Sequence, residues 1–169
     1  LAVKPLWFLF LLISTRYLGP GEFGRFMYAL SFVSVLAYVF EGGLDAFLMR
    51  EVARDRAEYD RLFASSAALK LLSGLLVALV GALSAWAIGM RPEQIALIAI
   101  AGAHPIANGL MTHIRFAFRG LEVMQYEARS IMVEKVLVLL LCGAALLVDK
   151  HASSLMMAFV LAYVGPCIV

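Results

Sequence analysis

The charged residues of this chain are confined to short clusters, and long uncharged apolar runs separate those clusters. Residues 71–90 and 95–114 each give 20 residues without Asp, Glu, Lys or Arg. An α-helix needs about 20 apolar residues to cross the hydrocarbon core of a bilayer, and a charge at its centre is costly. The chain is 63% hydrophobic and 15% charged, whereas soluble domains are about 45–50% apolar and about 25% charged. The pattern therefore predicts an all-α membrane protein.

The apolar runs predict a bundle of six transmembrane helices, of which the outer two are truncated. Both ends of the chain fall inside apolar runs. We therefore expect residues 1–169 to be a partial transmembrane domain, the N-terminal lobe of a longer protein whose C-terminal lobe is missing. Glu134 and Lys135 are expected in the first turns of their span, near the headgroups, where such side chains can pair. The expected spans are approximately 1–15, 24–43, 68–90, 94–115, 131–148 and 152–169.

Basic residues are unevenly shared between the loops that join these spans. The first, third and fifth loops carry four, and the second and fourth carry nine. Since cytoplasmic loops are enriched in Lys and Arg, we expect the loops around 50–66 and 116–130 to be cytoplasmic, in a multi-pass protein of the cytoplasmic (inner) membrane. The nine are Arg50, Arg54, Arg56, Arg61 and Lys70, followed by Arg115, Arg119, Arg129 and Lys135.

Proline and glycine predict irregular backbone at three points. Pro105 should bend the fourth span because proline removes a helix hydrogen bond. Gly42-Gly43 should end the second span, and Pro20-Gly21 should form a tight turn. Small residues along the third and fourth spans allow close helix approach, although Ala and Gly are also simply common in such helices. Examples are Gly74, Ala78, Gly81, Gly102 and Ala107.

Three loop motifs stand in a fixed order along the chain: RYLGPGEFG (16–24), GLDAFLMREVARD (43–55) and RFAFRGLEVMQYEA (115–128). In this order and spacing they closely resemble the oligosaccharide-lipid flippases, of the O-antigen flippase type, in the multidrug/oligosaccharidyl-lipid/polysaccharide exporter superfamily. The resemblance covers essentially the whole chain. It is to the N-terminal lobe of a MATE-like exporter, and the motifs do not identify the sugar carried.

The resemblance implies a two-lobed exporter for polysaccharide biosynthesis (O-antigen, capsule or exopolysaccharide) that works by alternating access. Its partners would be the lipid bilayer, a polyprenyl-pyrophosphate-linked oligosaccharide and the missing C-terminal lobe. A cavity that takes up a pyrophosphate requires cationic and hydrogen-bonding side chains that face inward.

Five residues are candidates for this substrate pathway. Lys70 begins the third span near the expected cytoplasmic mouth, although it could instead snorkel to the interface. His104 and Asn108 share one helical face and could line the pathway or form hydrogen bonds between helices. Arg119 could meet an incoming phosphate or simply enforce topology, as could Arg115. Lys4 could reach the cavity from the first span.

Other polar residues are expected to structure the loops. Arg16 should cap carbonyl groups or pair with Glu22. Glu41 and Asp45 could sense protons, but local pairing with Arg50 is the favoured interpretation. His113 is expected at the interface. The expected loop-structuring residues are Arg16, Gly19, Pro20, Gly24, Arg50, Arg54 and Asp55.

The segment REVARDRAEYDR (50–61) is expected to form one cytoplasmic surface helix near anionic headgroups. Its oppositely charged side chains recur at four-residue spacing, which suits an exposed helix. The pairs are Arg54 with Glu58 and Arg56 with Asp60.

Several function classes are disfavoured. A net charge of +2 without a basic-aromatic run does not indicate nucleic-acid binding. The three histidines are dispersed and the two cysteines lie in apolar runs, so we expect no metal, no cofactor and no catalytic residue. A cation-coupled drug antiporter of the same superfamily needs a carboxylate buried in the membrane, and here every acid is expected in a loop or near a helix end. A polyprenyl-phosphate enzyme or a non-transporting scaffold are the remaining alternatives.

Overall fold

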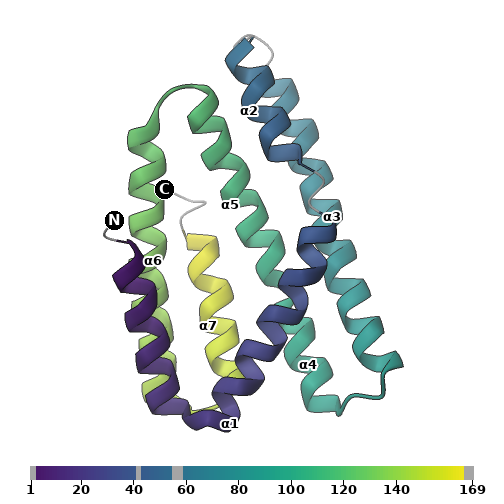
Figure 1. Ribbon diagram of the computed structural model, residues 1–169, viewed down its shortest axis with the longest axis vertical. Coiled ribbons are helices and arrows are strands. Elements are labelled where there is room, and N and C mark those ends of the chain that lie inside the picture. The colour runs from purple at the N-terminus through teal and green to yellow at the C-terminus, as the bar shows by residue number, and fades with distance from the viewer. Residues whose placement is uncertain (1–2, 41–42, 55–58, 166–169) are drawn as a thin grey trace.

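The computed structural model describes residues 3–40, 43–54 and 59–165, and these residues form an all-helical protein (Figure 1). Within the described residues, four helical stretches are long and apolar enough to cross a membrane: α1, α3, α6, and α4 together with α5 (Pro92–Gly120). The all-α membrane fold is therefore confirmed. The helices are α1 (Val3–Phe40), α2 (Leu44–Arg54), α3 (Tyr59–Ala87), α4 (Pro92–Ala101), α5 (Ala103–Gly120), α6 (Met124–Val148) and α7 (Ala152–Val164).

Helix α1 bends sharply at Gly19, where φ is 76° and ψ is 167°. This backbone conformation is open essentially to glycine alone. Pro20 follows, and proline is favoured at the first position of a helix because its missing N–H has no partner there. A straight helix of 38 residues would be about 57 Å long, nearly twice a bilayer core. The bend therefore divides α1 into two helical halves, and the expected turn at Pro20-Gly21 is a kink without a loop.

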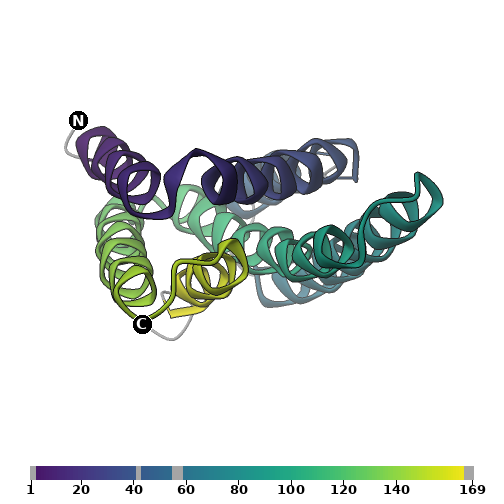
Figure 2. The same ribbon diagram turned by 90° about the horizontal axis from the view of Figure 1, so that it is seen from below.

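The two halves of α1 diverge from the bend as a V, and α1 runs along one long side of the molecule (Figures 1 and 2). The first half packs beside α6, and the second beside α3 and α4. The α3–α4 and α6–α7 turns lie at the same end as the bend, and α2 and the α5–α6 turn lie at the opposite end. The two basic loop regions thus share one end of the molecule, as the charge count predicts.

The fourth apolar run is interrupted in its middle. Helix α4 ends at Ala101 and α5 begins at Ala103. Pro105 has no N–H for the Ala101 carbonyl, and its ring crowds that position. The interruption therefore falls one turn before the proline that was expected to bend this span.

Small residues bring α3 close to α4 and α5. A Cβ on Gly102 would lie 2.8 Å from the Ala78 Cβ and 3.0 Å from its Cα, and a Cβ on Gly74 would lie 2.7 Å from Ile106 Cγ1. These contacts are shorter than any side-chain carbon tolerates. Close approach, which was one of two interpretations of the small residues, therefore applies at Gly74, Ala78 and Gly102.

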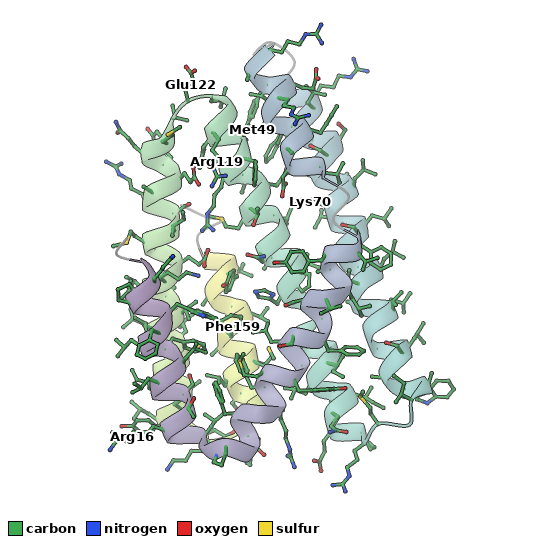
Figure 3. The ribbon with its side chains drawn as sticks, in the orientation of Figure 1. Arg16, Met49, Lys70, Arg119, Glu122 and Phe159 are labelled. Carbon is green, nitrogen blue, oxygen red and sulfur yellow. The ribbon has the colours of Figure 1, made fainter. Side chains whose placement is uncertain are left out.

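An aromatic cluster within the main core joins α1 to α7. Phe159 of α7 contacts the rings of Trp7, Phe10 and Phe26, at centroid distances of 6.0, 5.7 and 5.6 Å. Phe10, Phe26 and Phe159 are fully buried, and Figure 3 shows Phe159 in the middle of the bundle. Ring pairs of this geometry add about 0.5–1.5 kcal/mol each beyond area burial.

Helix α2 has a small core of its own, in which Leu48 and Val52 pack with Ala117 of α5. The expected single surface helix over 50–61 is wrong, because α2 ends at Arg54 and Tyr59 already belongs to α3. Residues 55–58 and the side chain of Asp60 lie outside the described part of the structure, so the pairs expected there are not seen. Burying one apolar face against α5 decides the position of α2.

Candidate functional site

Four polar side chains form a buried network where α2, α3 and α5 meet. The Lys70 ammonium donates to Asp45 Oδ2 at 2.6 Å. His113 Nδ1 lies 2.9 Å from Asp45 Oδ1, and His113 Nε2 lies 2.8 Å from Ser66 Oγ. Lys70 and Ser66 are each only 4% exposed and His113 is fully buried. Both carboxylate oxygens of Asp45 therefore have a buried nitrogen partner.

The close docking of α2 on α5 makes this network possible. Gly120 allows it, since a Cβ there would lie 3.1 Å from the Met49 carbonyl oxygen and 3.2 Å from Val52 Cβ. Figure 3 shows Met49 and Lys70 near this junction. Asp45 lies in the first turn of α2, where a carboxylate also interacts favourably with the helix dipole.

The environment of Asp45 favours its charged form. Burial on its own would raise the pKa of this carboxyl group, but the hydrogen bonds and charges of His113 and Lys70 outweigh it, so the pKa is lowered from its ordinary value. The carboxylate therefore stays ionised at neutral pH and holds α2 to both α3 and α5.

This network corrects three expectations. Asp45 pairs with Lys70 and His113 rather than with Arg50. Lys70 does not snorkel to the interface, since its ammonium is bonded inside the protein. His113 is buried rather than interfacial. Glu41, the other acid expected near Arg50, lies outside the described residues.

Three of the five pathway candidates line adjoining cavities between α1, α3 and α5. A cavity of about 210 Å³ is lined by His104 and Asn108 together with Ser34 and Tyr38. A smaller one of about 40 Å³ is lined by Lys70 and again by Asn108. We call these two cavities the groove; they share Ala37, Pro105 and Asn108.

His104 has a polar atom without a partner. Its ring packs at 5.3 Å on Phe159 and at 4.7 Å on Tyr163, and its Nε2 is buried without a hydrogen bond. An unsatisfied buried nitrogen costs about 1–3 kcal/mol. The hydrogen bond between helices that was one expected role of His104 is therefore not formed at this nitrogen.

A second buried ionic cluster centres on Glu134. Its Oε2 accepts from Arg115 Nη2 at 2.5 Å, and its Oε1 accepts from Lys135. Arg115 Nε also donates to Ser130 at 3.0 Å, and the Lys135 ammonium lies 5.4 Å from the centre of the Trp7 ring. Glu134 is only 1% exposed and lies near the middle of the 25-residue helix α6. The expectation that every acid lies in a loop or near a helix end is therefore wrong.

Arg119, the fourth pathway candidate, is engaged by α6. Its Nε donates to both carboxylate oxygens of Glu127 at 2.9 Å, and its guanidinium lies 4.8 Å from the centre of the Phe116 ring. Figure 3 shows Arg119 between the ends of α5 and α6. These hydrogen bonds between Arg119 and the Glu127 carboxylate connect α5 to α6. Arg119 lines neither cavity of the groove.

At the opposite end, Glu22 holds the start of α7. Its Oε2 accepts from the Ala152 backbone N–H at 2.9 Å, and its Oε1 accepts from Arg25 at 2.9 Å. A carboxylate is favourable at a helix N-terminus. The expected pairing of Arg16 with Glu22 is replaced by this arrangement, and Arg16 is exposed beside Tyr17 and Lys150.

The remaining expected residues are placed as follows. Gly19 and Pro20 form the bend of α1, and Gly24 lies exposed just beyond it. Lys4, the fifth pathway candidate, and Arg50 and Arg54 are exposed and line neither cavity of the groove. Asp55 lies outside the described residues.

The sequence interpretation missed Ser66, expected Asp45 to pair with Arg50, and expected Glu134 near a helix end. Ser66 precedes Lys70 by four residues, about one helical turn, so the sequence does place the two side chains on one helix face. No spacing signal links Asp45, Ser66 and His113, because the partners are 68 and 47 residues apart. In the described part of the chain, no group of three His, Cys, Asp or Glu side chains is arranged to hold a metal ion.

The architecture, with its bent α1 and its long apolar helices, is that of a multi-pass membrane protein. No curated protein and no solved structure matches the chain. The family model described as polysaccharide biosynthesis protein matches residues 1–169. The chain therefore belongs to the polysaccharide biosynthesis protein family.

Proposed function

We propose that this protein is a flippase that moves a polyprenyl-pyrophosphate-linked oligosaccharide across the cytoplasmic membrane. The observation that carries the proposal is the groove, whose two adjoining cavities are lined by Lys70 and by His104, with Asn108 lining both. Polar side chains at such depth are expensive, and they usually serve a transport path. Family membership supplies the link to polysaccharide biosynthesis.

The groove has the chemistry that a sugar-phosphate lipid requires. Asn108, Ser34 and Tyr38 offer donors and acceptors for sugar hydroxyl groups, and His104 Nε2 has its bonding capacity unused. Lys70 adds a cation for the pyrophosphate. The two cavities of the groove, of about 210 and about 40 Å³, are smaller than the roughly 300–1,000 Å³ of complete ligand pockets. The groove is thus one wall of a cavity that a second lobe completes.

We infer the orientation from charge. The end that carries α2 and the α5–α6 turn, with loops around 50–66 and 116–130, faces the cytoplasm. Lys70, which lines one cavity of the groove, lies on the side of the bundle toward this end (Figure 3), so we infer that the lipid-linked sugar enters from the cytoplasmic leaflet.

A cation-coupled antiporter of the same superfamily is the second candidate, and Glu134 is the observation that favours it. A carboxylate buried in mid-helix is what such exchange needs. Here Arg115 and Lys135 each pair with one of its two oxygens, so the protein's own cations already occupy the position that an exchanged cation would take. The flippase is therefore the better-supported function.

The test is a flipping assay in cells that depend on this protein for export. His104→Ala and Asn108→Ala should each cause undecaprenyl-linked repeat units to accumulate on the inner leaflet. Matched controls are His151→Ala and Gln94→Ala, at the far end of the bundle, which should leave flipping unchanged. Normal flipping with both groove variants, at equal protein abundance, would refute the proposed pathway. Drug resistance that depends on Glu134, without any effect on repeat units, would instead support the antiporter.

A further inference from the structure

We propose that Asp45, Ser66 and His113 form a proton-binding site, and that this site is linked through Lys70 to anion binding in the groove. The first part stands on the hydrogen-bond geometry alone. The second part rests on the proposed function, because it concerns the anionic substrate of the groove.

The carboxylate of Asp45 fixes which nitrogen of His113 takes up the proton. An ionised carboxylate only accepts hydrogen bonds, so the contact of 2.9 Å between His113 Nδ1 and Asp45 Oδ1 requires a proton on Nδ1. Nε2 is then the nitrogen that gains or loses a proton. It faces Ser66 Oγ at 2.8 Å.

Ser66 is able to serve both protonation states of His113. Its hydroxyl group lies 2.8 Å from His113 Nε2 and also 2.5 Å from the Leu62 carbonyl oxygen. When Nε2 has no proton, Ser66 donates to it. When Nε2 is protonated, it donates to Ser66 Oγ, and the hydroxyl hydrogen turns to Leu62. Every buried polar atom of the site keeps a partner in both states, so a proton from water can bind without the loss of a hydrogen bond.

Asp45 and Lys70 are the charged members of the network that contains the His113 ring. The other described charged residues of α2 and α3 include Arg50, Arg54 and Arg61, which are exposed, and Glu51, which is half-buried. Asp45 of α2 favours the protonated ring, and Lys70 of α3 opposes it. The acids of α6 instead pair with Arg115 and Arg119, which lie about 200° and 240° around α5 from His113. Helix α7 has no charged residue, and the charged residues of the described parts of α1 and α4 lie near the far end or in the first turns.

Lys70 connects this site to the groove because it belongs to both. Its ammonium bonds to Asp45 and lies 3.4 Å from the Gly109 carbonyl oxygen, beside the cavity that Asn108 also lines. An anion that enters the groove and attracts Lys70 weakens its pairing with Asp45. A proton on His113 then restores a cation to that carboxylate. Anion binding and proton uptake therefore favour one another, and by linkage each raises the affinity for the other.

The proton site is tested by ¹⁵N NMR of the histidine-labelled full chain in lipid nanodiscs, with His113→Gln to assign the signal. We expect Nδ1 to stay protonated while Nε2 gains a proton as the pH is lowered. Lys70→Met should change the pH at which this signal moves, because it removes the cation that pairs with Asp45. A signal without a proton on Nδ1, or a titration that Lys70→Met does not move, would overturn the site.

Ser65 and Ser66 provide a matched pair. Both hydroxyl groups bond to the Leu62 carbonyl oxygen, but only Ser66 contacts His113. Ser66→Ala should change the Nε2 signal, and Ser65→Ala should leave it unchanged. Equal effects of the two variants would contradict the role of Ser66.

The linkage is tested by adding vesicles that contain a long-chain polyprenyl pyrophosphate and following proton uptake with a pH indicator. Uptake in the unchanged protein that His113→Gln abolishes supports the linkage. Binding without proton uptake overturns the linkage and leaves the flippase proposal standing. Absence of binding overturns the proposed function and the linkage together, while the histidine titration still decides the proton site.

Discussion

The ion pair between Asp45 and Lys70 predicts that a second substitution, at Lys70, restores the docking of α2 that a substitution at Asp45 weakens. Asp45→Asn keeps the shape of the side chain and an acceptor for His113, but it leaves the buried Lys70 ammonium without its carboxylate. Adding Lys70→Met removes that charge as well. We therefore expect the single variant to weaken the docking of α2 strongly and the double variant to restore most of it.

The magnitude follows from the geometry. At 2.6 Å and an effective dielectric constant of about 20, the Coulomb attraction is roughly 6 kcal/mol, and desolvation of two buried ions offsets most of it. Removing one partner of such a pair costs about 3–5 kcal/mol. The Asp45 side chain is 13% exposed, so we take the lower end, about 3 kcal/mol. The double variant should lose less than about 1 kcal/mol.

Thiol labelling at Leu48→Cys measures this docking, because Leu48 is fully buried between α2 and the bundle. The background chain has Cys142 and Cys167 replaced by Ser. A loss of about 3 kcal/mol should raise the labelling rate roughly 150-fold, since about 1.4 kcal/mol is tenfold. The double variant should label less than about fivefold faster than the background.

Glu51→Gln is the matched control, because it removes an acid from the same helix that takes no part in the network. It should leave labelling within about twofold, as surface substitutions cost about 0.5 kcal/mol or less. If the double variant labels as fast as Asp45→Asn alone, the buried-pair reasoning is refuted.

Three further predictions concern pH, packing and the second ionic cluster. The pKa of Asp45 is lowered in the folded protein, so its stabilisation of α2 is fully present above the unfolded pKa of about 3.9 and is lost as the pH falls through the folded pKa. Labelling of Leu48→Cys with an acid-tolerant disulfide reagent should therefore accelerate as the pH falls through the folded pKa. The same acceleration should be absent when Asp45→Asn is added. Gly102→Ala should destabilise the bundle by about 1–3 kcal/mol, whereas Gly143→Ala, with nothing within 4 Å, should not lower the thermal midpoint. Glu134→Gln should cost about 3 kcal/mol because it leaves two buried cations, but Glu127→Gln, whose partner is 42% exposed, should cost at most about 1 kcal/mol; equal shifts in thermal midpoint would contradict this.

Local chemistry made several features predictable. Gly19 and Pro20 mark the bend of α1, and Pro105 marks the interruption between α4 and α5, because both effects arise from backbone constraints within one turn. Close helix approach was only one of two interpretations of the small residues, and contacts between helices decided for it at Gly74 and Gly102. The distribution of Lys and Arg predicted which loops share an end of the molecule, since each crossing reverses the chain.

The partners of the polar residues could not be predicted in this way. Lys70, His104 and Asn108 were identified as candidates, and they do line one groove. Lys4 and Arg119 were identified by the same reasoning, and they do not. The sequence around a basic residue near a helix end is similar whether its side chain faces a cavity, an acidic side chain or water. Its burial depends on which helix packs against it.

The sequence by itself determined that this protein is a helical membrane protein, because apolar length and charge spacing are properties of each segment and its solvent. Only the tertiary structure decided that α2 docks on α5, that Asp45 joins Lys70 and His113, and that Glu134 is buried among cations. These contacts join residues 25, 68 and 19 positions apart. Helix packing sets them, and no periodicity along the chain records which faces will meet.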